Sequence, residues 1–391
     1  MAGDGLRVDP GHRGGRTPGR GEQAGRGAES TGLTAVVVGA AGHTGGEVCR
    51  LLLGHPYVGE ILPTSRSDLP FDQTHPNLRG CGLVYRSADE ALDARPDVAF
   101  LCAPAGEAMR MAPRFLTAGT RVVDLGPDFR FADPDVYTRV YGRPHLAPEL
   151  LAKAAYGVSE LNRAEITAAR LVANPGCYVI TALLALYPLL GAAFVDWSSL
   201  IRISAINGTS GGGTAPHPRL MHAEVAGSML SYSLNGHRHA PELETVLGRL
   251  GGRPVSVDLS TAYGPFVRGT FLTASLSVGT AWRDDLDRDA VLDRYRKTYG
   301  SGADGEYFVR VVDQPRRGGL NEKEYDLYPR LADVVGSNFC HVGTDYDATH
   351  AVIRVVAVTD NLGKGAAGSA IQNMNLLTGL PESTGLAAYA L

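Results

Sequence analysis

A strand that runs directly into a glycine-rich turn constrains this chain more than any other feature. Residues 33–40 (LTAVVVGA) are apolar and β-branched enough to form a buried parallel strand, and residues 46–55 have helical spacing. Glycines at such a junction let the backbone approach a pyrophosphate, which then lies at the positive end of the helix. The pattern predicts a dinucleotide site formed by Gly39, Gly42, His43, Thr44 and Gly45.

The next predicted strand, residues 60–66, indicates which dinucleotide binds. It ends in Ser65 and Arg66, about 20 residues after the glycines, where NAD enzymes place an acidic residue on the ribose. A hydroxyl and a guanidinium suit a 2′-phosphate instead, so NADPH/NADP is the predicted cofactor. A solvated loop charge is the alternative interpretation of Arg66.

Alternating strand and helix signals predict the fold class. Apolar strands at residues 97–105 and 120–126 flank a helical stretch at 109–118. We therefore expect an α/β protein with a Rossmann-type doubly wound parallel sheet, followed by an α+β catalytic domain. Ligands bind at the carboxyl ends of such strands, so Arg130 is a candidate clamp for an anionic substrate. An ion pair with Asp124 or Asp128 is the alternative.

Cys177 is the predicted nucleophile. It lies in the segment ANPGCY, directly before the apolar helical run of residues 179–190. A helix N-terminus carries a partial positive charge and stabilises a thiolate. Pro and Gly before a helix are also ordinary start signals, so a structural cysteine is the alternative. The run is too short for a bilayer and contains a proline, so no membrane role is expected.

His237 and His239, in the segment GHRHAPE, are the candidates for acid–base catalysis with Cys177. Two histidines at this spacing can also bind metal, but an arginine separates them and no third ligand stands out, so no metal is expected. Residues 205–213 and 360–368 are rich in glycine and can approach a phosphate or cofactor closely. A plain glycine loop or close helix packing is the alternative for each.

Composition excludes several classes of function. The 391 residues carry a net charge of -4 and 44% hydrophobic side chains, which fits a two-domain soluble enzyme without a basic surface for nucleic acid. Five scattered cysteines favour a reducing, cytoplasmic compartment. We expect a disordered Gly/Arg-rich tail at residues 1–32, an NADP-binding domain at 33–173, a catalytic domain at 174–360 and a segment at 361–391 that returns to the first domain.

Taken in order, the motifs GAAGHTG, TSR, DLGPDFR, ANPGCY, NGTSGGG, GHRHAPE, VRG, GSNFC and DNLGKGAAGSAIQNMN resemble the N-acetyl-γ-glutamyl-phosphate reductase family. The resemblance implies that an acyl phosphate forms a thioester on Cys177 and is reduced to a semialdehyde. It implies a homo-oligomer, a dimer or tetramer. It also implies substrate contacts at Arg130, Asn174, Ser210 and Arg268, and further cofactor contacts at Ala103, Pro104, Gly211, Asn361, Lys364 and Gly365.

Departures from the family pattern leave the substrate open. Asn207 stands where the family usually has serine, and Ala103-Pro104-Ala105-Gly106 replaces a Leu-Pro-His-Gly loop. Residues 75–80 and 216–228 resemble the lysine-biosynthesis branch, whose aminoadipyl phosphate is bound to an acidic carrier protein of the LysW type, rather than the arginine-biosynthesis branch. An aspartate-semialdehyde dehydrogenase-like enzyme and a catalytically silent NADP-sensing regulator are the alternative functions.

Overall fold

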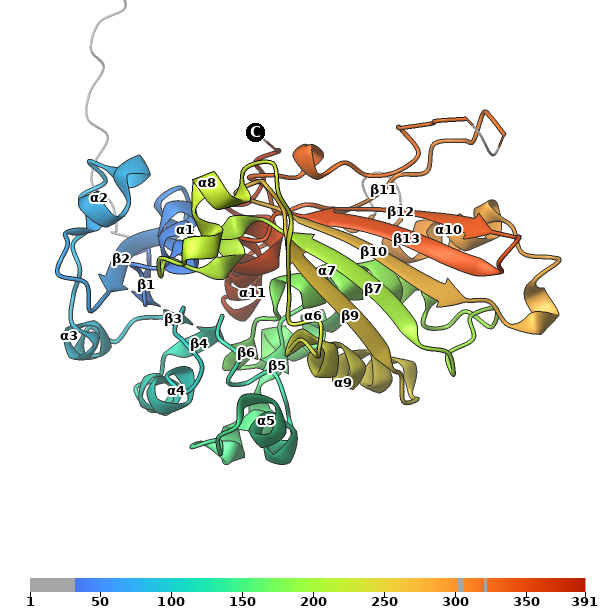
Figure 1. Ribbon diagram of the computed structural model, residues 1–391. Helices are drawn as coiled ribbons and strands as arrows, with labels where there is room; N and C mark the ends of the chain where they lie inside the picture. Colours follow the sequence, from blue (N-terminus) through green and yellow to red (C-terminus); the bar gives the residue numbers. More distant parts are fainter. Residues whose placement is uncertain (1–31, 301–304, 320–321, 391) are drawn as a thin grey trace, which may run out of the picture. The chain divides into compact units, whose positions relative to one another are not determined.

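Two β-sheets organise the protein in the computed structural model, which describes residues 32–300, 305–319 and 322–390 (Figure 1). The predicted tail, apart from Gly32, lies outside the described residues. Both sheets belong to one compact unit that begins at Gly32.

The first sheet is parallel throughout and has the strand order β2-β1-β3-β4-β6-β5. Its strands are β1 (Leu33–Val38), β2 (Val58–Thr64), β3 (Val98–Leu101), β4 (Arg121–Asp124), β5 (Ala155–Tyr156) and β6 (Leu171–Ala173). The intervening helices are α1 (His43–Leu53), α2 (Phe71–Thr74), α3 (Ala88–Asp93), α4 (Ala108–Thr117), α5 (Pro134–Tyr141) and α6 (Ser159–Ala168). The strands β1, β3, β4 and β6 are largely buried, because helices cover a sheet of this type on both faces. The predicted Rossmann-type α/β fold is confirmed.

The second sheet is mixed and has the order β11-β12-β13-β10-β7-β9-β8. Its strands are β7 (Ile201–Asn207), β8 (Leu230–Tyr232), β9 (Val257–Tyr263), β10 (Thr270–Ser277), β11 (Val309–Val311), β12 (Cys340–Asp347) and β13 (Val352–Thr359). Burial alternates along β10, as it does when helices cover one face only. The helices that pack on that face are α7 (Cys177–Leu186), α9 (His239–Gly251) and α10 (Arg288–Tyr299), and the short α8 (His222–Val225) precedes β8.

α7 is the central helix of this half of the protein. Every residue from Tyr178 to Leu186 is buried, because the helix is apolar around its whole circumference. The helix predicted for residues 179–190 forms as α7 and a following 3₁₀ turn, Tyr187–Leu189, in which Pro188 cannot continue the α-helical hydrogen bonding.

After β13 the chain passes back to the parallel sheet. A π-helical turn, Gly363–Ala367, leads into α11 (Gly368–Leu377), which packs against α1, α6 and β4 (Figure 1). This crossing brings residues near position 365 next to the start of α7. Within the described ranges, no helix combines the length and the apolar character that a membrane crossing requires.

Candidate active site

Cys177 is the first residue of α7, and the turn before it determines where the sulfur lies. β6 ends at Ala173, and Gly176 is the N-cap of the helix. Between them, the Asn174 side chain donates to the carbonyl oxygen of Ala366 at 3.2 Å and accepts from the Ser369 hydroxyl at 3.1 Å. Cys177 therefore lies at the carboxyl edge of the parallel sheet, where open α/β sheets bind ligands.

A cleft of about 720 Å³ has Cys177 in its lining. This volume falls within the roughly 300–1,000 Å³ that is usual for small-molecule sites. The lining brings together most of the predicted site residues: Gly42, His43, Thr44, Gly45, Ala103, Pro104, Arg130, Asn174, Cys177, Ser210, Gly211, His239, Asn361 and Gly365. The other predicted residues are not part of it: Gly39, Ser65, Arg66, His237, Arg268 and Lys364.

The glycine turn after β1 forms one wall of the cleft. Gly39 has a φ of +75°, and a Cβ at this position would lie 2.3 Å from the carbonyl oxygen of Cys102. A Cβ at Gly45 would lie 2.5 Å from the carbonyl oxygen of Gly39. Only glycine fits both positions, so the turn stays tight and its backbone can meet a pyrophosphate. His43 Nδ1, 3.2 Å from the carbonyl oxygen of Ser210, links this turn to the second glycine-rich segment.

Ser65 and Arg66 follow β2, the parallel neighbour of β1. The Arg66 side chain is exposed. Dinucleotide-binding sheets contact the adenosine ribose from this position, after the second strand. Their contact with a 2′-phosphate stays a prediction.

His239 and His237 occupy different places relative to Cys177. A Cβ at Gly176 would lie 2.4 Å from His239 Nε2, so the His239 ring packs against the residue that precedes the nucleophile. His239 lines the cleft, whereas His237 does not. The His237 Nδ1 instead accepts a hydrogen bond from the backbone N–H of His239 at 3.1 Å. The geometry favours His239 as the acid–base group and gives His237 a supporting position.

Burial keeps both imidazoles neutral at physiological pH. Burial, and then the positive charge of Arg130, hold the pKa of His239 well below its usual value. Burial and Arg238 lower the pKa of His237 to about 4. A neutral imidazole can accept a proton from a thiol. Among the described residues, no group of three or more histidine, cysteine, aspartate or glutamate side chains is placed to hold a metal ion.

The electrostatic state of Cys177 differs from the sequence-based expectation of a thiolate. Burial raises the pKa of the thiol above its ordinary value. The Tyr178 backbone N–H, the guanidinium groups of Arg130 and Arg238, and the Asn207 amide oppose this shift without cancelling it. The positive end of the helix acts in the expected direction, but desolvation is larger. In the ligand-free protein Cys177 is therefore a thiol that must transfer its proton when it reacts.

Arg130 is held by a buried carboxylate that we did not single out in the sequence. Its Nη1 lies 3.2 Å from Glu242 Oε2, and its Nε donates to the carbonyl oxygen of Asn174 at 3.0 Å. Glu242 also accepts from the Tyr156 hydroxyl at 2.7 Å and from the Gly176 backbone N–H at 3.2 Å. Glu242 thus fixes both the cationic wall of the cleft and the turn before Cys177. The alternative pairing of Arg130 with Asp124 or Asp128 is not among its hydrogen bonds.

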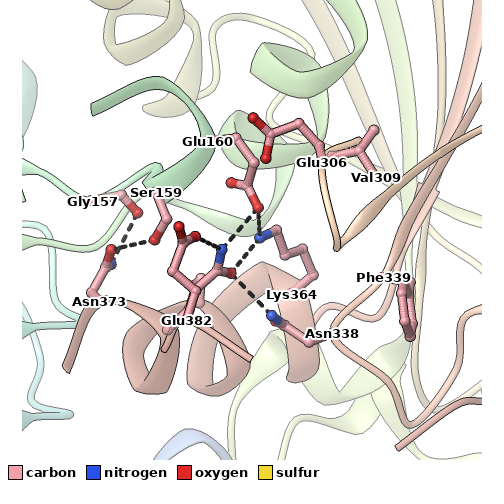
Figure 2. A network of polar contacts seen from close by, with 12 residues as sticks. Gly157, Ser159, Glu160, Glu306, Val309, Asn338, Phe339, Lys364, Asn373 and Glu382 are labelled. Carbon is pink, nitrogen blue, oxygen red and sulfur yellow. Dashed lines mark hydrogen bonds and ion pairs between the residues drawn. The ribbon is translucent and has the colours of Figure 1, made fainter. Parts of the chain in front are cut away.

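Lys364 lies in the interior, which corrects the prediction that it contacts the cofactor. Figure 2 shows its ammonium directed at Glu160 in a network of polar contacts. The side chain is 0% exposed, and its Nζ donates to Glu160 Oε1 at 2.5 Å and to Gln372 Oε1 at 2.7 Å. Its neighbours Gly365 and Ala366 do line the cleft. The motif therefore reaches the site through its backbone and small residues.

Arg268 also departs from its predicted role in substrate binding. Its Nε donates to Asp360 Oδ2 at 2.9 Å and its Nη2 to Glu47 Oε1 at 2.7 Å. Glu47 is on α1 and Asp360 follows β13, so this guanidinium bridges the two halves of the protein. The charge of Arg268 is already matched by two carboxylates, which leaves little attraction for a substrate phosphate.

The cleft also contains residues that were not among the predicted site residues. The lining also contains Leu125, Val140, Tyr141, Thr214 and Arg238. Arg238 lies between the two histidines, where it argued against a metal site and could supply part of a positive surface for an acidic carrier protein. Val140 and Tyr141, at the end of α5, come from a stretch without a recognisable motif.

Comparisons with known proteins agree with this architecture. A protein-family model described as "Semialdehyde dehydrogenase, NAD binding domain" matches residues 34–169, and one described as "Semialdehyde dehydrogenase, dimerisation domain" matches residues 177–361. Among solved structures, aspartate semialdehyde dehydrogenase II from Vibrio cholerae has a TM-score of 0.65 at 19% identity, over 89% of this chain and 99% of that chain. The Candida albicans enzyme, solved with NADP, has a TM-score of 0.62 at 16% identity, over 89% and 98%. At these identities the likeness concerns the fold.

Curated relatives are more similar in sequence. The N-acetyl-gamma-glutamyl-phosphate reductase of Acidithiobacillus ferrooxidans is 38% identical over 92% of this chain and 99% of that protein. The reductase of the same name from Azotobacter vinelandii is 39% identical over 91% of this chain and 98% of that protein. With this identity over nearly the full length of both proteins, the chain is an oxidoreductase that belongs to the N-acetyl-γ-glutamyl-phosphate reductase family.

Proposed function

We propose that this protein reduces N-acetyl-γ-glutamyl phosphate to its semialdehyde with NADPH, through a thioester on Cys177. The observation that carries the proposal is the convergence of Cys177, His239 and Arg130 in one cleft beside the glycine turn. The names of the relatives supply the acyl phosphate, and the chemistry of the cleft residues suits it. A nucleophile, a neutral base and a cation are the groups that acyl transfer from a phosphate requires.

The first half of the reaction follows from the state of these groups. His239 accepts the thiol proton, and the Cys177 sulfur forms a bond to the acyl carbon. The bond between that carbon and the phosphate oxygen then breaks, and phosphate leaves with the electron pair. Arg130 stabilises negative charge on the substrate, because its side chain faces the cleft while Glu242 holds it in place.

The second half returns the enzyme to its starting state. The glycine turn after β1 would hold NADPH, and the bound cofactor would supply the hydride that reduces the thioester carbonyl. The carbonyl oxygen becomes negative in this step, and we expect backbone N–H groups in the first turn of α7, which have no partner within the helix, to stabilise it. The carbon–sulfur bond then breaks, the semialdehyde leaves, and the sulfur recovers its electron pair. His239 then gives the proton back to the Cys177 sulfur.

An NADPH-oxidation assay with N-acetylglutamyl phosphate tests the proposal. We expect NADPH to be consumed and phosphate to be released in equal amounts. Turnover of aspartyl phosphate alone would indicate the aspartate-semialdehyde dehydrogenase-like alternative. Tight NADPH binding without oxidation of the cofactor by any acyl phosphate would indicate the regulatory alternative.

The choice of NADPH over NADH rests on Arg66. Its exposed guanidinium directly follows the strand next to β1, where a ribose 2′-phosphate would be contacted. A charged contact is worth about 1.5–3 kcal/mol, so Arg66→Ala should weaken NADPH binding roughly 10- to 150-fold. NADH binding, measured in parallel, should change little. Equal losses for the two cofactors would contradict a contact with the 2′-phosphate.

A second candidate substrate is an acyl phosphate bound to an acidic carrier protein. A groove of about 660 Å³ shares His43, Ser210, Gly213 and Thr214 with the cleft and continues along the segment from Ala215 to Met221. A substrate extended by a carrier would have room to leave the cleft along this groove. Arg219, whose side chain is 75% exposed and 3.5 Å from Glu224, lies in the same segment.

Salt dependence separates the two substrates. Attraction between a carrier and exposed charges is screened beyond roughly 8–10 Å near physiological ionic strength. If the carrier is the partner, kcat/KM for the carrier-bound substrate should fall steeply with salt, and Arg219→Glu should lower it further. The free substrate, with the same variant, is the control and should respond much less. Efficient turnover of free N-acetylglutamyl phosphate and none of a carrier-bound substrate would assign the protein to arginine synthesis.

We also propose that the protein is a homodimer or homotetramer whose contacts use the second sheet. Helices cover one face of this sheet, and on the other face side chains such as Arg202, Asp258 and Arg354 are exposed. The family model that matches this region is described as a dimerisation domain. Sedimentation analysis, with Arg354→Glu as the disrupting variant, tests the proposal. A wild-type protein that sediments as a monomer would contradict it.

A further inference from the structure

A row of buried polar side chains crosses the second sheet beside Cys177. Thr270 on β10 pairs in register with Asn207 on β7 and, on its other side, with Thr359 on β13. The three residues are at most 2% exposed. Polar side chains in such a position need hydrogen-bond partners, and the partners show what the row holds in place.

The hydrogen bonds of this row reach Cys177 at two points, its sulfur and its backbone carbonyl oxygen. The Thr270 hydroxyl donates to Asn207 Oδ1 at 3.0 Å, and Asn207 Nδ2 donates to Cys177 Sγ at 3.5 Å. The hydroxyls of Thr359 and Thr181 are 2.7 Å apart, and Thr181 donates to the Cys177 carbonyl oxygen at 2.9 Å. One end of the row thus contacts the reactive sulfur and the other contacts the backbone.

We propose that Asn207 is a catalytic residue whose amide N–H stabilises the Cys177 thiolate, and that Thr270 is the positioning residue that keeps this N–H directed at the sulfur. The proposal deepens the proposed function and rests on it. The same N–H serves when the sulfur attacks the acyl carbon and when it leaves the semialdehyde carbon, because the sulfur carries negative charge at both points.

The orientation of the amide is the critical feature. An asparagine side chain presents either an N–H donor or a carbonyl acceptor, and the two differ by a flip. The Thr270 hydroxyl donates to Oδ1, which leaves Nδ2 for the sulfur. Gly211 makes room for this arrangement, since a Cβ there would lie 2.3 Å from Asn207 Nδ2.

The contact acts against a substantial desolvation of the sulfur. Burial raises the pKa of the Cys177 thiol, and the Asn207 amide is among the groups that lower it. The Asn207 amide supplies a hydrogen-bond donor to the sulfur and, because it is neutral, brings no further charge into the buried site. The charged and titratable groups around the sulfur are Arg130 after β4, Arg238 and His239 at the start of α9, and Tyr178, Tyr232 and Tyr263 from α7, β8 and β9.

Alkylation of Cys177 by iodoacetamide across a pH series tests the proposal on the full-length protein. Mass spectrometry of the Cys177 peptide separates this thiol from the other cysteines. The loss of a hydrogen bond to an ionised group corresponds to about one pH unit, so Asn207→Leu should raise the midpoint of alkylation by about this amount. Thr270→Val should raise it by less, since the amide is then free to flip. Asn207→Asp should raise it most, because a carboxylate repels the thiolate.

Thr181→Val is the matched control, because it removes the contact at the Cys177 carbonyl and leaves the sulfur contact intact. Its midpoint should equal that of the wild type. Unchanged midpoints in Thr270→Val and Asn207→Asp, in variants that retain a cooperative thermal transition, would overturn the proposal even if Asn207→Leu failed to fold. Alkylation requires neither acyl phosphate nor NADPH, so this result does not depend on the proposed substrate.

Discussion

Two buried pairs of opposite charge, Arg130 with Glu242 and Lys364 with Glu160, resemble each other in chemistry but differ in their surroundings. Both cations are at most 9% exposed and both carboxylates accept further hydrogen bonds. Arg130 lines the cleft, whereas Lys364, on the π-helical turn, donates to Glu160 on α6 and Gln372 on α11; Figure 2 shows Lys364 and Glu160. Burial and charge alone therefore do not identify a functional cation.

The difference lies in which donors remain for a ligand. Arginine has five N–H groups, and Arg130 uses one on each nitrogen, for Asn174, Glu242 and the carbonyl oxygen of Leu125. One N–H on each Nη remains. The Lys364 ammonium donates to Glu160 and Gln372 and packs 5.4 Å from the centre of the Phe308 ring. Two of its three N–H groups are used in the interior and its side chain does not line the cleft, whereas Arg130 lines the cleft with two N–H groups to spare.

Cys177→Ser should have the largest effect, and the effect should be confined to the cleft. A serine hydroxyl next to a neutral histidine is a much poorer nucleophile than a thiolate, so kcat should fall by more than about 1,000-fold. NADPH affinity, measured by fluorescence titration, should stay within about twofold, because the glycine turn is untouched. A tenfold loss of kcat is on the order of what one minor contact contributes. A serine variant that kept about a tenth of the wild-type kcat would therefore rule out thioester chemistry at this residue.

Lys364→Met should instead destabilise the fold. Removal of one partner of a buried ion pair leaves an uncompensated charge and costs about 3–5 kcal/mol of unfolding free energy, measurable by urea titration. The double variant with Glu160→Leu should recover much of this loss, since neither charge then remains. The kcat of the folded fraction should change by less than about threefold. A stable Lys364→Met variant with impaired NADPH binding would reverse the assignment and restore Lys364 as a cofactor residue.

Glu242→Gln should have an intermediate and mixed effect. Glutamine keeps the size of the side chain and part of its hydrogen bonding but removes the charge opposite Arg130. We expect kcat/KM to fall about 10- to 100-fold and the unfolding free energy by about 1–2 kcal/mol, because Arg130 retains two backbone carbonyls and can be hydrated from the cleft. A loss confined to KM would mean that Glu242 only orients Arg130. A loss confined to kcat would point to the Gly176 turn and Cys177.

Local patterns in the sequence were enough to predict the first sheet and the position of the nucleophile. The strand of residues 33–40, its glycine turn and the following helix are neighbours in the chain, and each has its own periodicity. Cys177 was recognisable because Pro175, Gly176 and the apolar run stand next to it. Features set by neighbouring residues can be read before the fold is known.

Contacts across the fold could not be predicted in the same way. Glu242 meets Arg130 across 112 residues, and Lys364 meets Glu160 across 204 residues. The small residues around Lys364 correctly suggested a close approach, but only the crossing from β13 to α11 determines that the backbone faces the cleft and the ammonium faces the interior. Asn207 was noticed as a departure from the family pattern, yet its contact with the sulfur depends on the register of β7 with β10.

Arg268 forms ion pairs of intermediate exposure with two carboxylates. Its substitution should have the smallest effect on stability among these variants. Its side chain is 22% exposed and contacts Glu47 and Asp360. Arg268→Met should lower the unfolding free energy by about 1–2 kcal/mol at neutral pH. This value lies between the small contribution of an exposed ion pair and the larger cost of breaking a buried one. Arg50→Met, which removes a second and more exposed partner of Glu47, is the matched control and should cost less.

The pH dependence of this effect has a definite sign. Burial alone would raise the pKa of Glu47, but hydrogen bonds from Arg50 and Arg268 lower it from 4.5 to about 2. A carboxyl with a lowered pKa stabilises the fold fully above its unfolded-state value, and this stabilisation is lost as pH falls toward the folded-state value. The difference between wild type and Arg268→Met should therefore be greatest above pH 4.5 and shrink toward about pH 2. If the stability difference did not depend on pH and Arg268→Met raised the KM for the acyl phosphate, Arg268 would instead be a substrate-binding residue.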